Sequence, residues 1–327
     1  MSLKLSDFTK NIFKHIKTTP DCIKYSLNFI KKTWYYKWLK SINFEDINVK
    51  YTIKQLDKNL VLPEIIKMCY CYWVDTELAK KEIIKLNNLY EIDSENVKFI
   101  VLENNDKNKY QIIELLKYFE FIKRYFNVKL QKKPIIYFIL TPLQKTFEIK
   151  NKIIDIHNVN SGYTDILNCK IFIWRLEEFT KVYFHELIHL FKLDKHINDA
   201  KINFEINGLT SYNEALTDYL GISFHIIYLN NITGKSLKKI VWLELNWIYS
   251  QAFIINLILQ NKEIYQKSPA YSYYILKYFI FEYAFTNNPL EIEIHGLINK
   301  LVTKKIDVSC KKYIKSPSSR MSLIQLI

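Results

Sequence analysis

The sequence predicts an α+β protein in which a small mixed β-sheet with an edge strand is followed by a mainly helical C-terminal half. Short runs rich in β-branched and aromatic residues, typical of strands, are found before residue 177. After that point, apolar residues recur at helical spacing. Only five glycines and seven prolines are present, so tight turns and flexible linkers are few, which favours a compact, helix-rich body.

The predicted elements follow one another in a simple order. A helix starting at Pro20 and Asp21 opens the chain, and a second one covers 110–126. Strands are predicted at 97–103, 134–140, 152–158 and 170–176. Helices then follow at 177–192, about 211–229, 236–260, 268–286 and 290–303. We therefore expect a mainly helical N-terminal region over 1–130 and a second region over 131–327 that ends in a helical subdomain.

The net charge of +14 comes from 47 basic and 33 acidic residues. Such a balance suits an acidic substrate or a nucleic acid. The basic residues are nearly all lysines, whereas proteins that read nucleic-acid sequences rely on the bidentate contacts of arginine. The abundance of Ile, Lys, Asn and Tyr is typical of AT-rich genomes. A nucleic-acid partner is therefore considered but not favoured.

Compartment and membrane topology are predicted from two further observations. The five cysteines are odd in number and lack the spacing of a zinc knuckle or a redox pair, as expected for thiols in a reducing compartment. The N-terminus lacks a signal-peptide pattern, and the most apolar stretch (245–259) is too short to span a membrane. We expect an intracellular protein without a membrane span, located in the cytoplasm, or in host cytoplasm or the virion if the AT-rich source is a virus.

The segment KVYFHELIHLF (181–191) places ionisable groups in an otherwise apolar stretch. On a helix, His185 and His189 project from one face one turn apart, so both rings can bind one zinc ion. Glu186 lies about 100° around the helix, where it can serve as general base for a water molecule. The structural alternative is a pair of buried histidines bound to backbone groups.

A catalytic zinc needs a third protein ligand. The extended pattern H-E-x-x-H-x-x-G-x-x-H fails, because lysines occupy its last two positions. Glu214 is the better candidate, on a helix capped by Thr210 or Ser211. Asp218 shares its helix face and would accept the N–H of a ligand histidine, although a solvated acidic face is the alternative for such a pair. His225 lies eleven residues beyond Glu214, too far to bind the same ion, and is predicted to be structural.

HELIH at 185–189 followed by NEALTD at 213–218 resembles the gluzincin metallopeptidases, the clan of thermolysin-like enzymes, over about residues 170–221. The resemblance implies a zincin-like catalytic region with one Zn²⁺ on His185, His189 and Glu214. It implies that Glu186 is catalytic and that Asp218 pairs with His185. It also implies that the strand at 169–175, next to the active-site helix, exposes an edge that pairs with an extended substrate. The aminopeptidase signature G-x-M-E-N is absent, so the subfamily stays unassigned.

These residues together predict zinc-dependent hydrolysis of peptide bonds in a protein or peptide substrate. Candidates for a second donor to the oxyanion are Tyr271, Tyr273, Tyr274 and His295, among which the sequence does not choose. Two other interpretations stay open. One is a catalytically inactive metallopeptidase fold with a binding or structural role, and the other is a basic nucleic-acid-associated protein in which the motif is incidental.

Overall fold

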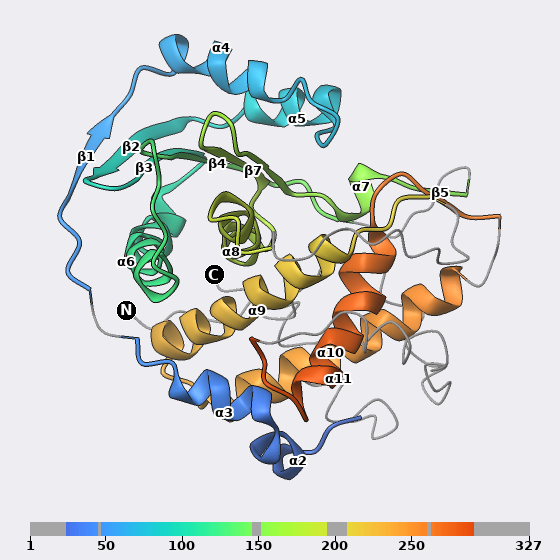
Figure 1. Ribbon diagram of the computed structural model, residues 1–327. Coiled ribbons are helices and arrows are strands. Elements are labelled where there is room, and N and C mark those ends of the chain that lie inside the picture. The colour runs from blue at the N-terminus through green and yellow to red at the C-terminus, as the bar shows by residue number, and fades with distance from the viewer. Residues whose placement is uncertain (1–23, 45–46, 146–151, 195–207, 260–262, 291–327) are drawn as a thin grey trace. The chain divides into compact units, whose positions relative to one another are not determined.

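The computed structural model describes residues 24–44, 47–145, 152–194, 208–259 and 263–290 (Figure 1). The chain forms two compact units. Unit 1 comprises residues 1–43, 146–159 and 194–327, and unit 2 comprises residues 44–145 and 160–193. Within the described residues, a six-stranded mixed sheet is combined with helices that dominate the C-terminal half, so the predicted α+β class is confirmed.

The sheet belongs to unit 2 and has the strand order β1-β2-β3-β4-β7-β6. Its strands are β1 (Tyr51–Gln55), β2 (Asn88–Ser94), β3 (Lys98–Glu103), β4 (Ile135–Thr141), β6 (Gly162–Asp165) and β7 (Lys170–Arg175). The three central strands β3, β4 and β7 run parallel, and the outer strands pair antiparallel. Strands β3 and β4 lie on either side of residue 130 in the chain, pair directly and belong to the same unit.

The strand that precedes the helix with the HELIH motif is not at the edge of the sheet, contrary to the implication of the family resemblance. That strand is β7, and it lies between β4 and β6. The edge strand on this side of the sheet is β6, whose four residues GYTD are all half-buried. Sequence analysis missed β6, since a four-residue strand with a glycine and an aspartate lacks the apolar run that predicts a strand.

Helices cover both faces of this sheet within unit 2 (Figure 1). On one face, α4 (Lys58–Met68) and α5 (Thr76–Ile83) bury Ile65 and Ala79 against Ile100 and Leu102 of β3. On the other face lie α6 (Lys109–Tyr125) and α8 (Phe179–Leu190). The alternation of side chains along β3 sends successive residues to opposite faces, so each face receives its own apolar core.

Core packing also fixes α8 against the strands. The ring of Tyr183 on α8 lies 5.8 Å from that of Phe138 on β4, measured between centroids. The Tyr183 hydroxyl donates to the carbonyl oxygen of Leu115 in α6, at 3.1 Å. A buried hydroxyl needs such a partner, and this bond joins α8 to α6.

Unit 1 is mainly helical. Its elements are α2 (Leu27–Lys32), α3 (Trp34–Ser41), β5 (Ile153–Ile154), α7 (Ile156–Val159), α9 (Tyr212–Thr233), α10 (Leu237–Leu259), β8 (Tyr265–Gln266), a π-helical segment (Ser272–Leu276) and α11 (Lys277–Ala284). The strand predicted at 152–158 is only the two residues of β5, followed by α7. The predicted start at Pro20 and most of the helix predicted at 290–303 lie outside the described residues.

The helix predicted near the N-terminus is interrupted at Thr33. Its ψ of 146° is that of extended backbone, so α2 ends there and α3 begins. The Thr33 hydroxyl accepts a hydrogen bond from the backbone N–H of Tyr36, at 3.1 Å. Threonine caps a helix in this way by satisfying an N–H that has no partner within the helix.

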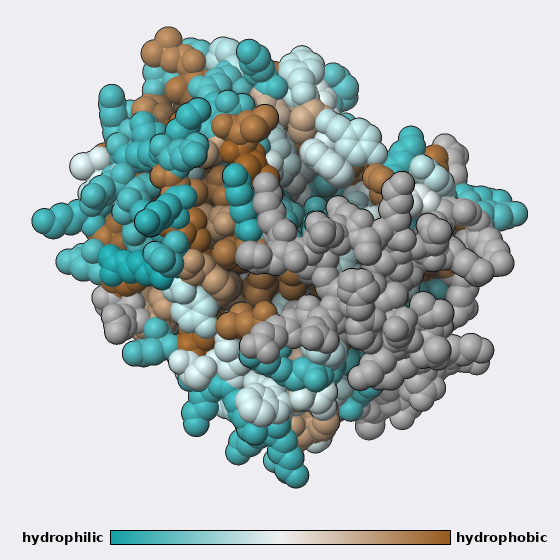
Figure 2. All heavy atoms as spheres, viewed as in Figure 1, coloured by the Kyte–Doolittle hydropathy of each residue, from teal (hydrophilic) through white to brown (hydrophobic). Residues whose placement is uncertain are grey.

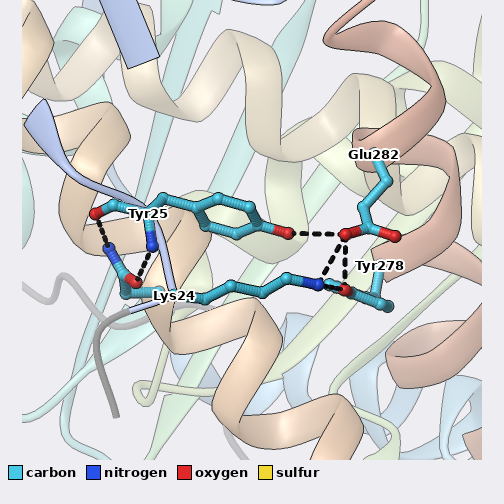
Figure 3. Close-up of polar contacts among 5 residues, drawn as sticks. Lys24, Tyr25, Tyr278 and Glu282 are labelled. Carbon is cyan, nitrogen blue, oxygen red and sulfur yellow. Dashed lines mark hydrogen bonds and ion pairs between the residues drawn. The ribbon is translucent and has the colours of Figure 1, made fainter. Parts of the chain in front are cut away.

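A polar network joins the start of the described chain to α11 (Figure 3). Glu282 accepts hydrogen bonds from the ammonium group of Lys24 at 2.6 Å and from the hydroxyl of Tyr278 at 2.6 Å. The hydroxyl of Tyr25 donates to the same oxygen at 3.1 Å, and its backbone N–H donates to Asn246 Oδ1 on α10. This network attaches the segment before α2 to α10 and α11.

Within the described residues, no helix combines the length and the apolar character needed to cross a membrane. The longest apolar helix, α10, has buried polar side chains at Glu244, Asn246 and Gln251. On the face seen in Figure 2, much of the described surface is hydrophilic, with smaller hydrophobic areas between. The hydrophilic character of this surface is consistent with the large number of lysines in the sequence.

Candidate metal centre

Helix α8 presents both histidines of the HELIH motif to one side. Their ring centroids lie 4.9 Å apart, with the ring planes at 78°. Every residue of α8 is buried except His189, which is half-buried. The four-residue spacing of the two rings on one helix face is therefore observed as predicted, and the helix that carries it is firmly packed in unit 2.

The start of α8 is held by buried charges. Glu178, the N-cap residue, has φ 60° and makes no side-chain cap bond to the helix. Its carboxylate instead binds the ammonium group of Lys145 at 3.1 Å, and both side chains are almost fully buried. The backbone N–H of Lys145 donates to Glu177 Oε2 at 2.6 Å. Burial lowers the pKa of Lys145, opposed by the charge of Glu178. These contacts anchor the first turn of the helix.

The carboxylate of Glu186 faces the edge strand β6. Its Oε2 accepts a hydrogen bond from the hydroxyl of Thr164, at 2.8 Å. The same hydroxyl lies 3.0 Å from the backbone oxygen of Glu186. Glu186 is 5% exposed, so its carboxylate depends on such polar contacts. Sequence analysis placed Glu186 beside the histidines but did not find Thr164.

In unit 1, Glu214 lies in the first turn of α9. The hydroxyl of Ser211 accepts a hydrogen bond from the backbone N–H of Glu214 at 3.3 Å, which makes Ser211 the N-cap that the sequence offered together with Thr210. The backbone N–H of Ser211 donates to the hydroxyl of Ser272 at 2.8 Å. The first turn of α9 is therefore fixed from inside the helix and from the π-helical segment.

Asp218 lies one turn further along α9 and is fully buried. Its Oδ2 accepts a hydrogen bond from the ammonium group of Lys277 at 2.6 Å, and Lys277 is 1% exposed. In a π-helical turn, residues five apart lie above one another, because its hydrogen bonds run from i to i+5. The segment thus turns Ser272 and Lys277 toward the same helix, α9. The sequence predicted neither of these two contacts.

His185, His189 and Glu214 form a group that could hold a metal ion. Each offers one ligand atom, and these atoms lie within 4.8 Å of one another. Two imidazoles and one carboxylate are the donors of a known class of catalytic zinc site, which leaves a further position for water or substrate. The chemistry of the donors therefore fits a divalent metal ion with open coordination.

The remaining residues singled out in the sequence are one histidine predicted to be structural and four candidates for the oxyanion donor. His225 is 1% exposed and its ring stacks on that of Tyr228, with centroids 6.1 Å apart, which agrees with a structural role. Tyr273 and Tyr274 are buried in the π-helical segment. Tyr271 is half-buried, and burial raises the pKa of its hydroxyl to about 12. His295 lies outside the described residues.

Comparison of the chain with protein-family models, with curated proteins and with solved structures finds no match.

Proposed function

We propose that this protein is a zinc-dependent peptidase in which His185, His189 and Glu214 bind one Zn²⁺ and Glu186 is the general base. The observation that supports this proposal most directly is the grouping of the three ligand atoms within 4.8 Å. Glu186 follows one proposed ligand directly in sequence and is held by Thr164. A general base next to a metal site with an open position is the arrangement required for metal-assisted hydrolysis.

Zinc would supply a Lewis acid that polarises the peptide carbonyl and lowers the pKa of a water molecule to about 7. Glu186 accepts the proton of the attacking water and then delivers it to the leaving amine. The burial of Glu186 favours this role, because a carboxylate with little access to bulk water keeps the transferred proton within the site.

The edge strand β6 supplies a place for an extended peptide. It pairs with β7 on one side and is the last strand of its sheet among the described residues. An extended peptide can add to such an edge through main-chain hydrogen bonds, which select for backbone more than for side chains. Since Thr164 on β6 contacts Glu186, a peptide bound along β6 would come close to the general base.

Asp218 is proposed to orient His185 by accepting its second ring N–H. Its bond from Lys277 is compatible with this role, because a carboxylate has two oxygens and about four acceptor positions. The ammonium group engages Oδ2 in a short, charge-assisted hydrogen bond.

The test begins with the purified full-length protein. We expect one zinc per chain by elemental analysis, together with cleavage of a proteome-derived peptide library. Glu186→Gln should retain zinc and lose about 10²–10⁴-fold in turnover, as expected for removal of a general base. Glu77→Gln is the matched control, because the same change is made on an exposed glutamate of α5. Turnover of Glu186→Gln equal to that of the control would contradict the proposed role.

The third ligand is tested separately. Glu214→Ala should lower zinc content, since it removes one of three protein ligands. Unchanged zinc stoichiometry in this variant would mean that another residue completes the site. Zinc in the wild type without cleavage of any peptide would favour a binding role for the fold. Retention on DNA or RNA that falls with salt and survives loss of both histidines would favour the nucleic-acid alternative.

A further inference from the structure

We infer that Thr164 and Gly162 of β6 are positioning residues for Glu186, an inference that rests on the proposed peptidase function. The two residues are two apart in one strand, so their Cα–Cβ directions point to the same face of the sheet. That face is the one against α8, because both positions approach Glu186. Thr164 carries a hydroxyl, and Gly162 has no side chain and so leaves room beside Glu186.

Thr164 holds Glu186 at two points. Its hydroxyl oxygen lies 2.8 Å from the carboxylate Oε2 and 3.0 Å from the backbone oxygen of the same residue. A hydroxyl has one proton, which serves one of these acceptors at a time or is shared between them. Because both acceptors belong to Glu186, the contact restricts the torsions that separate the carboxylate from its backbone. A free glutamate side chain would sample several rotamers.

Gly162 provides the room that this conformation needs. A Cβ atom at position 162 would lie 2.9 Å from Glu186 Oε1 and 2.7 Å from Val182 Cγ1. Both distances are shorter than ordinary van der Waals contacts, so any side chain here would displace the carboxylate or the helix. The strand therefore provides a donor for Oε2 at Thr164, and the missing side chain at position 162 leaves room for Oε1.

Such fixation matters for a group that must receive a proton from one atom and pass it to another. Misplacing a catalytic group by about 1 Å can cost about 10²-fold in rate. The loss is expected in kcat, because Glu186 itself contributes to proton transfer and not to holding the substrate.

The test compares Thr164→Val, which is close in shape and lacks the hydroxyl, with Thr164→Ser, which keeps it. Tyr137→Phe is the matched control. It lies on β4, away from the proposed peptide-binding strand, and loses a hydroxyl that donates to Glu64 Oε1 at 2.8 Å. For each variant we would measure zinc content, kcat and KM on a peptide that the wild type cleaves, and the urea midpoint of the metal-free protein.

Thr164→Val should lower kcat about 10- to 100-fold, the range that corresponds to a hydrogen bond to a charged group. KM and zinc content should stay unchanged, Thr164→Ser should recover most of the turnover, and Tyr137→Phe should leave kcat unchanged. In a Glu186→Gln background, Thr164→Val should cost little more, because the two residues act as one unit. Wild-type kcat in Thr164→Val, or an equal loss in Tyr137→Phe, would overturn the inference.

Failure of the inference is distinguishable from failure of the proposed function. A wild-type protein that binds no zinc or cleaves no peptide would contradict the peptidase proposal and, with it, the positioning role. An active wild type with an unimpaired Thr164→Val variant would contradict the positioning role alone. In the metal-free protein, additive effects of Thr164→Val and Glu186→Gln on the unfolding equilibrium would refute the contact without reference to activity.

Discussion

Replacing the buried Lys277 with Met should destabilise unit 1. We expect this loss to be far larger than the loss on replacing Lys85, a surface lysine whose ion pair is equally short, with Met. Lys277 Nζ lies 2.6 Å from Asp218 Oδ2, with side chains 1% and 0% exposed. Lys85 Nζ lies 2.6 Å from Glu82 Oε1, with side chains 65% and 19% exposed. At this separation the attraction is about 1.6 kcal/mol in water and about 6 kcal/mol at an effective dielectric constant of about 20. Burial is thus the main difference between the two pairs.

The net effects follow from what each substitution leaves behind. Lys277→Met leaves the buried carboxylate of Asp218 without its ammonium group, which should cost about 3–5 kcal/mol of unfolding free energy. Lys85→Met leaves Glu82 in contact with water and should cost less than about 1 kcal/mol. Adding Asp218→Leu to Lys277→Met should recover part of the loss, because the uncompensated buried charge is then removed.

Urea unfolding followed by circular dichroism measures these differences, with a chelator present so that metal binding does not contribute. Equal losses in Lys277→Met and Lys85→Met would refute the reasoning, since the two pairs differ in burial and not in length. A double variant less stable than Lys277→Met alone would show that Asp218 is held mainly by other groups.

Two further predictions concern the edge strand and the buried tyrosines. Gly162→Ala should lower stability by about 1–3 kcal/mol through overpacking. Adding Val182→Ala should restore stability in urea unfolding but not peptidase turnover, because the collision with Glu186 Oε1 persists; recovery of both would contradict this. In the folded state, burial raises the pKa of Tyr35, Tyr183 and Tyr219. Their contribution to stability is therefore fully present below about pH 10, and it is lost above that pH at about 1.4 kcal/mol per unit for each tyrosine. Phenolate absorbance should rise together with loss of circular dichroism; gradual titration near pH 10 with the fold intact would oppose this prediction.

The central strands could be predicted from sequence because each is a continuous apolar run. β3, β4 and β7 are buried on both faces by the helices of unit 2, and their residues show it. The outer strands lack this signal. All five residues of β1, YTIKQ, are exposed, and their strand conformation depends on pairing with β2. A strand defined by its neighbour and not by burial leaves little trace in its own composition.

The residues of the candidate site also differ in how well they could be predicted from the sequence. The spacing of His185, Glu186 and His189 is local, so helical geometry suffices to put the two rings on one face. The contacts of Thr164 with Glu186 and of Lys277 with Asp218 join residues 22 and 59 positions apart in the chain. Neither threonine nor lysine stands out in this sequence, and only the folded chain brings each to its carboxylate.

In the π-helical segment before α11, the number of residues between positions 272 and 277 decides which side chains face α9. With regular α-helical geometry, positions 272 and 277 would lie about 140° apart around the axis, and only one of them could face α9. A residue inserted between these two positions would lengthen the turn further and rotate the ammonium group of Lys277 away from the carboxylate of Asp218. An insertion that is tolerated in a surface loop would therefore be damaging in this short stretch, even though none of its residues is a proposed ligand.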